Sequence, residues 1–366
     1  MILKDICKIN SGKSIKACLI CDKDINHNIP CFGGNGLRGF VSSPNQVGGN
    51  PIIGRVGAQC GNIHYCDEPF YATEHALVVT LKDDNVNPQW LCRKFESMKL
   101  GTYAEGAAQP VIAASKLLQL EIAIPPLSEQ QSIVDYLDSA FAKVDAMKAN
   151  AEKALNEAKA LFQASLKEML EPKEGWEEKK LEDITEVKDG THDSPKYVTE
   201  GIPFVTQKNI TINGFDLLNT KKITLEDHKK FYTRSNVEFG DIIIAMIGAN
   251  RGMSCIVDTR EIFSIKNVGL IKKNDNINMR YLLFYLHSPS ANTYILDNSN
   301  GGAQEFIGLK GLRTFPIPYP PLSVQQSIVE TLDSLKSKVD RLQENYDKIS
   351  QECDALKQAI LRKVFE

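Results

Sequence analysis

The chain has 366 residues, more than one domain usually contains, so two domains are the default expectation. Hydrophobic residues make up 42% and charged residues 24% of the chain, which excludes a collagen-like, wholly disordered or membrane-embedded protein. The net charge of −3 differs from the strongly basic balance of many nucleic-acid-binding domains.

The amino-terminal residues and the cysteines indicate the compartment. Residues 1–6 lack the long apolar run of a secretory signal, and no stretch approaches the ~20 apolar residues that a membrane span needs. Nine cysteines, an odd number in a chain large enough to form its own core, favour reduced thiols over a disulfide framework. We therefore expect a soluble, cytoplasmic protein.

An internal repeat is the strongest feature of the sequence. Residues 126–134 read Pro-Leu-Ser-Glu-Gln-Gln-Ser-Ile-Val, and residues 321–329 read Pro-Leu-Ser-Val-Gln-Gln-Ser-Ile-Val. Further upstream, four residues of the first copy match four of the second: Gly49, Ile53, Gly57 and Gly61 with Gly240, Ile244, Gly248 and Gly252. The repeat predicts the order arm, helix, arm, helix, with domain limits at 1–125, 126–172, 173–320 and 321–366.

In chain order, each arm is predicted to contain short strands and one late helix before a long helix follows. The runs 51–56 and 241–246 are typical of strands bounded by glycine turns. Residues 87–98 and 278–287 are rich in large apolar side chains and predict short helices. The fold class expected is α+β, with two pseudo-repeated mixed α/β domains and an antiparallel two-helix coiled coil.

The start of each long helix carries the Ser-x-x-Gln spacing of a capping box, Ser128 with Gln131 and Ser323 with Gln326. From there a seven-residue apolar repeat predicts a coiled-coil seam. The seam residues with large side chains are Leu137, Val144, Met147 and Leu161 in the first helix and Leu335, Val339, Leu342, Tyr346, Ile349 and Leu356 in the second. A second apolar stripe of the first helix, one place beyond the seam, holds Phe141, Leu155, Phe162 and Met169. Packing of each helix on its own arm alone is the alternative.

Chain connectivity predicts that the two helices are antiparallel. The second arm begins where the first helix ends and finishes where the second helix begins, so those two helix ends must lie close together. A helix of 43 residues from Ser128 to Leu170 is ~64 Å long at 1.5 Å per residue. The pair is therefore expected to hold two similar domains apart.

Three short motifs suggest chemistry but have weak support. Gly34-x-Gly36-x-x-Gly39 has dinucleotide-binding spacing, yet residues 40–44 do not predict the helix that would bind a pyrophosphate. Cys18, Cys21, His27 and Cys31 could ligate zinc, but the second arm has no equivalent set. Residues 191–194 contain the Thr, His, Asp and Ser of a hydrolase site as sequence neighbours, which cannot form a triad with one another. We expect no catalytic and no metal site.

Polar residues beside glycines in both arms are better candidates for binding. Side chains with the reach and hydrogen-bonding groups for base edges are Arg38, Arg55 and Gln59 in the first arm and Lys208, Asn209, Asn250 and Arg251 in the second. Taken singly, each is more often a solvated surface residue than a DNA contact. The net charge is +1 for residues 1–125 and 0 for residues 176–320, so attraction to phosphates would depend on local patches or on a basic partner.

These motifs together resemble the specificity subunit of type I restriction-modification systems, over essentially the whole chain. The resemblance rests on residues 126–134 and 321–329, on Gly106-Ala107-Ala108-Gln109 and Gly301-Gly302-Ala303-Gln304, and on Gly54-Arg55-Val56-Gly57, residues 240–243 and Asp189-Gly190-Thr191-His192. It adds Gln109, His192 and Gln304 to the candidate DNA contacts.

The resemblance implies a non-catalytic, sequence-specific DNA reader. Each arm would be a target recognition domain for one half of a bipartite target in double-stranded DNA, and the coiled coil would set the gap. Two modification subunits with S-adenosylmethionine would methylate adenine N6, and restriction subunits using ATP and Mg would complete the nuclease. No cofactor is expected in this chain. The alternative is a two-armed interaction scaffold that binds protein or carbohydrate.

Overall fold

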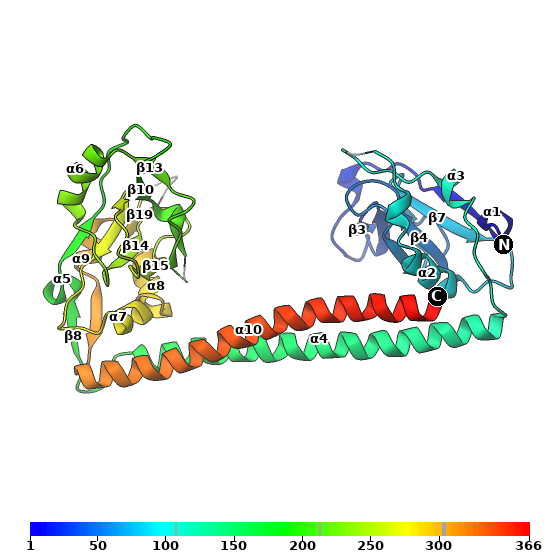
Figure 1. Ribbon diagram of the computed structural model, residues 1–366. Coiled ribbons are helices and arrows are strands. Elements are labelled where there is room, and N and C mark those ends of the chain that lie inside the picture. Colours follow the sequence, from blue (N-terminus) through cyan, green and yellow to red (C-terminus); the bar gives the residue numbers. More distant parts are fainter. Residues whose placement is uncertain (107, 212–213, 302–304) are drawn as a thin grey trace. The chain divides into compact units, whose positions relative to one another are not determined.

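The computed structural model describes residues 1–106, 108–211, 214–301 and 305–366 (Figure 1). The chain forms two compact units, the first made of Met1–Glu152 and Tyr346–Glu366 and the second of Lys153–Asn345. Each unit contains one arm and a stretch of both long helices, α4 (Leu127–Leu170) and α10 (Leu322–Phe365). None of the described helices has both the length and the apolar character that crossing a bilayer requires.

The first arm has a four-stranded antiparallel sheet in the order β1-β7-β4-β5 and a three-stranded sheet in the order β3-β2-β6. Its elements are α1 (Leu3–Ile6), β1 (Cys7–Ser11), η1 (Ala17–Leu19), β2 (Ile29–Gly33), β3 (Gly36–Val41), β4 (Asn50–Gly54), β5 (Ile63–Cys66), β6 (Tyr71–Ala72), β7 (Ala76–Leu81), α2 (Pro88–Met98), η2 (Leu100–Tyr103) and α3 (Ala114–Leu117). Strand β6 pairs with β2 in parallel, and the other pairs of this arm are antiparallel.

The second arm has a four-stranded antiparallel sheet in the order β15-β14-β17-β9 and a three-stranded sheet in the order β13-β10-β16. Two-stranded pairs are formed by β11 with β12, β18 with β19 and β20 with β8. Its elements are β8 (Glu177–Lys180), α5 (Leu181–Ile184), β9 (Val187–Asp189), β10 (Ile202–Val205), η3 (Gln207–Asn209), β11 (Ile210–Thr211), β12 (Gly214–Phe215), β13 (Lys221–Ile223), α6 (Leu225–Ser235), β14 (Ile242–Ala245), β15 (Ser254–Ile256), β16 (Ser264–Ile265), β17 (Val268–Ile271), α7 (Met279–Leu286), α8 (Pro289–Asp297), β18 (Ser299–Asn300), β19 (Phe306–Ile307), α9 (Leu309–Arg313) and β20 (Pro316–Tyr319).

The two arms share one topology, as the repeat predicts. Strands β1, β7, β4 and β5 correspond in order and direction to β9, β17, β14 and β15. The parallel pair β2–β6 corresponds to β10–β16. The same hydrogen bonds close the turn after β4 and after β14: Gly61 N–H donates to the Gly54 carbonyl over 2.8 Å, and Gly252 N–H donates to the Ala245 carbonyl over 2.8 Å. The predicted fold class, including the mixed α/β arms, is confirmed.

The long helices pack antiparallel within each unit. In the first unit, Leu137 packs with Leu361, whereas the Val144 carbonyl faces the Cys353 thiol at 3.7 Å. Residues further along α4 therefore contact residues earlier in α10, as in an antiparallel pair. In the second unit, Lys159 Nζ donates to Gln343 Oε1 over 2.8 Å. The two first-unit contacts confirm the predicted direction of the pair.

The buried face of α4 differs from the predicted seam. Leu137 and Val144 are buried as predicted, but Met147 and Leu161 are each 58% exposed. The second apolar stripe is buried in their place, through Phe141, Leu155 and Phe162. The predicted stripe alternates large side chains with alanines, so rotating the helix by about one position buries more apolar area. Met147 and Leu161 were therefore wrong as seam residues.

Five predicted seam residues of α10 are half-buried: Leu335, Val339, Leu342, Tyr346 and Ile349. Leu335 and Val339 pack against the core of the second unit. Leu356 is 45% exposed, whereas Cys353 and Leu361 beside it are buried. The prediction for Leu356 was wrong for the same reason as in α4, because the helix turns a neighbouring stripe inward.

Ser128 and Ser323 lie inside α4 and α10, so neither is the N-cap residue of the predicted capping box. Helix α4 already includes Ser128, and the Pro126 carbonyl accepts hydrogen bonds from Glu129 and Gln130 N–H. The side chain of Gln131 accepts a hydrogen bond from Asn87 Nδ2 over 2.8 Å and donates one to Asp135. Gln326 accepts from Asn278 Nδ2 and donates to Glu330 in the same way. These glutamines bind the arm and the next helical turn instead of capping the helix.

Two leucines of α4 distinguish the observed buried face from the predicted one. Leu155→Ala removes a side chain that is 3% exposed and should lower the free energy of unfolding by about 2–4 kcal/mol. Leu161→Ala, at a side chain that is 58% exposed, should change it by at most about 0.5 kcal/mol. Urea unfolding of the two variants and the parent measures both. Equal losses at the two positions would contradict the observed helix rotation.

Candidate nucleic-acid interface

In the second arm, the loops that follow four strands meet at one edge. Thr191 N–H donates to the Ile265 carbonyl over 3.1 Å, and Lys266 N–H donates to the Val205 carbonyl over 2.9 Å. These bonds join the loops after β9, β10 and β16. A side chain at Gly248 would place its Cβ 3.9 Å from Gln207 Nε2, so the loop after β14 lies beside η3. We call this group of loops the second loop cluster, and it brings together His192, Lys208, Asn209, Asn250 and Arg251.

His192 is held by a charged network. Its Nδ1 lies 2.7 Å from Asn267 Oδ1, and its Nε2 lies 3.1 Å from Asp189 Oδ2. The Asp189 carboxylate is buried and accepts two further hydrogen bonds from Arg234, each over 2.9 Å. The imidazole itself stays 61% exposed, so the network orients a ring that solvent or a ligand can reach.

The predicted contacts around η3 have different environments. Thr206 and Asn209 form a capping box, in which Asn209 Oδ1 accepts from Thr206 N–H over 2.9 Å. The amide of Asn209 is therefore used within the loop. Lys208 lies between them and is exposed. Lys208 is therefore exposed on this loop, whereas Asn209 shapes the loop that carries it.

Arg251 is committed to contacts within the protein, but Asn250 is exposed. One guanidinium nitrogen of Arg251 donates to the Gly248 carbonyl over 3.0 Å, and the other forms an ion pair with Glu305. The side chain of Arg251 is only 13% exposed. Asn250, at the tip of the same turn, is exposed, so it is the more accessible of the two side chains.

The first arm has the equivalent loop cluster with different side chains. Arg55 Nη1 donates to Ser11 Oγ over 2.9 Å, and Arg55 N–H donates to the His75 carbonyl over 2.9 Å, which joins the loops after β1, β4 and β6. Arg38 is exposed, and its side chain runs over Gly33. Gly57 N–H donates to the Pro110 carbonyl over 2.9 Å, so exposed Gln109 lies next to the turn that carries exposed Gln59. We call these loops, with the segments that carry Arg38 and Gln109, the first loop cluster.

The predicted residues thus gather in two places, one in each unit. Gln304 lies outside the described residues. Sequence reasoning missed Lys230, Arg234 and Lys266, which contact Asp193, Asp189 and Ser194 of the second loop cluster. Lys230 and Arg234 lie on α6, an element that the first arm lacks between the corresponding strands, so comparison of the two repeats gave no signal for them.

The other motifs have structural roles. Gly36 is the first residue of β3, with φ of 86°, so a strand and not a helix begins there. His192 contacts Asp189 and Asn267, while Ser194 accepts a hydrogen bond from Lys266, so residues 191–194 form a polar loop. Among the described residues, no group of three His, Cys, Asp or Glu side chains is placed to bind a metal ion.

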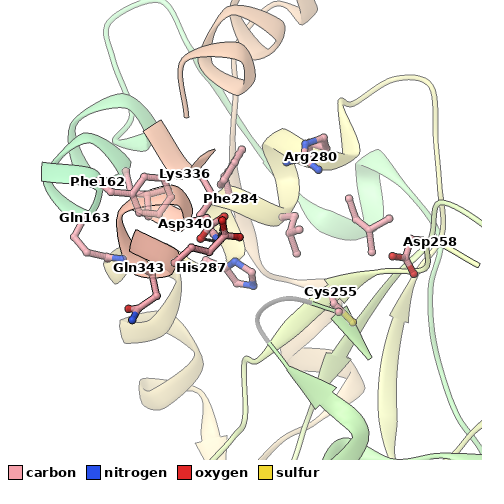
Figure 2. A pocket seen from close by; sticks show the side chains of 15 residues that line it. Phe162, Gln163, Cys255, Asp258, Arg280, Phe284, His287, Lys336, Asp340 and Gln343 are labelled. Atoms are coloured by element: carbon pink, nitrogen blue, oxygen red, sulfur yellow. Dashed lines mark hydrogen bonds and ion pairs between the residues drawn. The ribbon is translucent and has the colours of Figure 1, made fainter. Parts of the chain in front are cut away.

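A groove of about 840 Å³ in the second unit lies between α7, β15 and the long helices (Figure 2). His287 and Cys255 line it and would be its natural catalytic pair. Burial raises the pKa of the Cys255 thiol to about 12, so the thiolate that a nucleophile requires is disfavoured. The His287 Nε2–H donates to the Ser254 carbonyl over 2.9 Å, and burial lowers the pKa of this ring. Cys255 and His287 therefore do not form an activated nucleophile and base pair.

Comparison with known proteins identifies the family to which the chain belongs. The profile of the type I restriction modification DNA specificity domain matches residues 1–157 and 173–351. The chain is 39% identical over 137 residues to the Escherichia coli type I restriction enzyme EcoprrI specificity subunit, covering 37% of this chain and 34% of that protein. It is 23% identical over 359 residues to the E. coli EcoBI specificity subunit, covering 86% of this chain and 72% of that protein. The chain thus spans about a third of the first relative's length.

Solved structures show the same fold at low sequence identity. One, from a study of complex assembly and conformational transition of the type I R-M system, has a TM-score of 0.74 at 18% identity, covering 100% of this chain and 97% of that one. The HsdS subunit from Thermoanaerobacter tengcongensis has a TM-score of 0.59 at 18% identity, covering 100% and 95%. Because the family profile extends over both arms and most of both long helices, the chain belongs to the type I restriction modification DNA specificity domain family.

Proposed function

We propose that the chain is the non-catalytic subunit that reads DNA sequence in a type I restriction-modification complex. Each arm would bind one half of a bipartite target in double-stranded DNA. The observation that carries this proposal is the pair of loop clusters: one backbone framework occurs twice, with different polar side chains on each copy. A repeated framework with varied side chains suits two readers of unrelated sequences.

The charge of the arms is compatible with base reading but gives little general affinity for DNA. Exposed Arg38, Gln59 and Gln109 in the first arm and Lys208 and Asn250 in the second offer donors and acceptors of suitable length. The first arm carries a net charge of only +1 and the second none. Because phosphate neutralisation dominates non-specific affinity, tight binding would depend on basic partner subunits.

The long helices are proposed to bind those partners. Large apolar side chains remain exposed on them: Tyr136 at 57%, Met147 at 58% and Leu356 at 45% in the first unit, and Leu161 at 58% and Leu322 at 50% in the second. Exposed apolar side chains repeated along a helix suit docking of another helix. We infer that two modification subunits dock there and that restriction subunits join them in the cytoplasm. S-adenosylmethionine, ATP and Mg would be bound by those subunits, not by this chain.

The helices are also proposed to set the gap between half-sites. Each has 44 residues, or ~66 Å at 1.5 Å per residue. The domain limits that follow are 1–125 and 173–320 for the target recognition domains and 126–172 and 321–366 for the spacer helices. A rigid spacer of constant length would convert two independent readers into one reader of a split sequence.

Selection of bound DNA from a random double-stranded pool tests the function directly. The chain, purified together with its modification subunit, should select two sequence blocks separated by a fixed gap. A single block would mean that only one arm reads DNA. Absence of any block, with folded protein, would favour the alternative of a scaffold that binds protein or carbohydrate.

Two exposed cations should separate base reading from phosphate binding. Arg38→Ala should reduce discrimination at one base position of one half-site by about 1–3 kcal/mol, because a bidentate contact to guanine is lost. Lys208→Ala should weaken binding to all sequences alike and reduce the dependence of affinity on salt. Titration against single-base variants of the selected target at two salt concentrations measures both effects. A uniform loss for Arg38→Ala would reassign that residue to a phosphate.

The buried Asp189 should control the half-site that the second arm reads. Asp189→Asn removes a carboxylate that binds both Arg234 and His192, and should lower the free energy of unfolding by about 1–3 kcal/mol. Binding to one half-site should fall while the other half is read unchanged. The control is Asp193→Asn, which alters an exposed ion pair with Lys230 and should have little effect on stability. Loss of both half-sites in a folded Asp189→Asn variant would contradict independent reading by the arms.

A further inference from the structure

The first of the two adjacent glutamines in α4 is buried at the joint between the arm and its helix. Gln130 has 0% exposure. Its Oε1 accepts a hydrogen bond from Asn87 N–H over 2.7 Å, and its Nε2 donates to the carbonyls of Asn85 and Pro125, each over 2.9 Å. The amide thus links the turn before α2, the segment before α4 and α4 itself.

Asn87 connects this joint to the short helix of the arm. Its Oδ1 caps α2 by accepting from Gln89 and Trp90 N–H, and its Nδ2 donates to Gln131 Oε1 over 2.8 Å. The two glutamines therefore bind the backbone and the side chain of one capping residue. Rotation of α2 about α4 would break these bonds.

The second unit repeats this joint with equivalent residues. Gln325 also has 0% exposure, accepts from Asn278 N–H over 2.8 Å and donates to the Pro320 carbonyl over 2.8 Å. Gln326 Oε1 accepts from Asn278 Nδ2 over 2.9 Å, and Asn278 caps α7. Three of the four hydrogen bonds recur, whereas the Asn276 carbonyl, the equivalent of the Asn85 carbonyl, accepts from the Tyr319 hydroxyl. The shared bonds belong to the repeat and not to one arm.

Each joint has a second attachment further along the same pair of helices. Arg93 of α2 donates to Asp138 of α4 over 2.8 Å, and Arg280 of α7 donates to Asp333 of α10 over 3.0 Å. The aspartates are equivalent, but Arg93 lies six residues after its capping asparagine and Arg280 two residues after its own. The two arms reach the same anchor from different positions, so the second attachment is retained although the arm sequences differ.

A glutamine suits this joint better than any similar side chain. One acceptor and two donor hydrogens are used in a site without solvent, and each buried group that lost its partner would pay a desolvation cost. Glutamate could accept from Asn87 but could not donate to two carbonyls. Methionine matches the length of glutamine but makes none of the three hydrogen bonds.

We propose that Gln130-Gln131 and Gln325-Gln326 are orientation clamps, positioning residues that fix the angle of each arm on its long helix and so restrict the chain to one gap between half-sites. The inference rests on the proposed function. An arm attached at two points cannot rotate about its long helix. Its loop cluster is therefore held at one rotational position around the DNA axis.

The test compares Gln130→Met and Gln325→Met with Gln358→Met, the same change at an exposed position of α10. Each full-length variant, with its modification subunit, selects DNA from a pool in which the two half-sites are constant and the gap varies. For both clamp variants, the preference for the parental gap over gaps one base pair longer or shorter should fall about tenfold, as loss of these hydrogen bonds implies. The sequences of the half-sites should stay unchanged, and Gln358→Met should match the parent.

Hydrogen exchange of the α2 backbone amides provides a readout that does not depend on DNA. Exchange should speed up in Gln130→Met and stay parental in Gln358→Met. Gln131→Met removes only exposed hydrogen bonds, those to Asn87 and Asp135, and serves as a milder variant if Gln130→Met does not fold. Folded clamp variants with parental gap preference and parental exchange would overturn the proposal. If the parent selects no bipartite DNA, the proposed function fails, and exchange alone decides whether the clamp holds the arm.

Discussion

Each arm shares its hydrophobic core with the long helices, and the rest of the structure depends on this continuity. In the first unit, Val134 of α4 is part of the core formed by the sheet and α2, and Phe365 of α10 lies 6.2 Å from the Trp90 ring. In the second unit, Phe162 packs against Phe284 at 6.5 Å between ring centres. Such an arm cannot move independently of its helices, because detaching it from them would expose apolar surface.

The loop clusters show how a constant backbone can carry variable side chains. The turns after β4 and β14 are closed by backbone hydrogen bonds and by glycines with positive φ, 98° at Gly57 and 73° at Gly248. Since these bonds use no side chain, the intervening residues are free to differ, as Gln59 and Asn250 do. The turn fixes the backbone conformation, and the side chains at its tip can vary without disturbing it.

The repeat made the architecture predictable, because it records which elements correspond and how the chain connects them. The rotation of α4 was not predictable from the same pattern. Two apolar stripes, one through Met147 and one through Phe141, lie one position apart on the helix, and only packing against the rest of the unit selects between them. Heptad spacing identifies a seam but does not determine which of two adjacent stripes has the larger neighbours.

The structure brings most of the candidate contacts together on loops in each arm, but their contact with DNA stays a prediction. Arg55 and Arg251, two candidates with the reach for base edges, are tied to Ser11 and Glu305. Those partners are 44 and 54 residues away, so no local pattern could reveal them. The role of Gln130 was missed for the same reason, since its partner Asn87 lies 43 residues upstream.

The shared core also limits where one arm ends and a helix begins. The compact units divide α4 after Glu152 and α10 after Asn345, whereas the repeat in the sequence places the limits of the arms at the helix starts. The two divisions differ because the limits predicted from the repeat follow chain order, whereas the units follow packing. An arm exchanged at its sequence limits would meet the host's Phe162 and Leu166, which line the groove beside α7. Compatibility of an incoming arm is therefore decided by the side chains on its short helix that face the long helices, as much as by its reading loops.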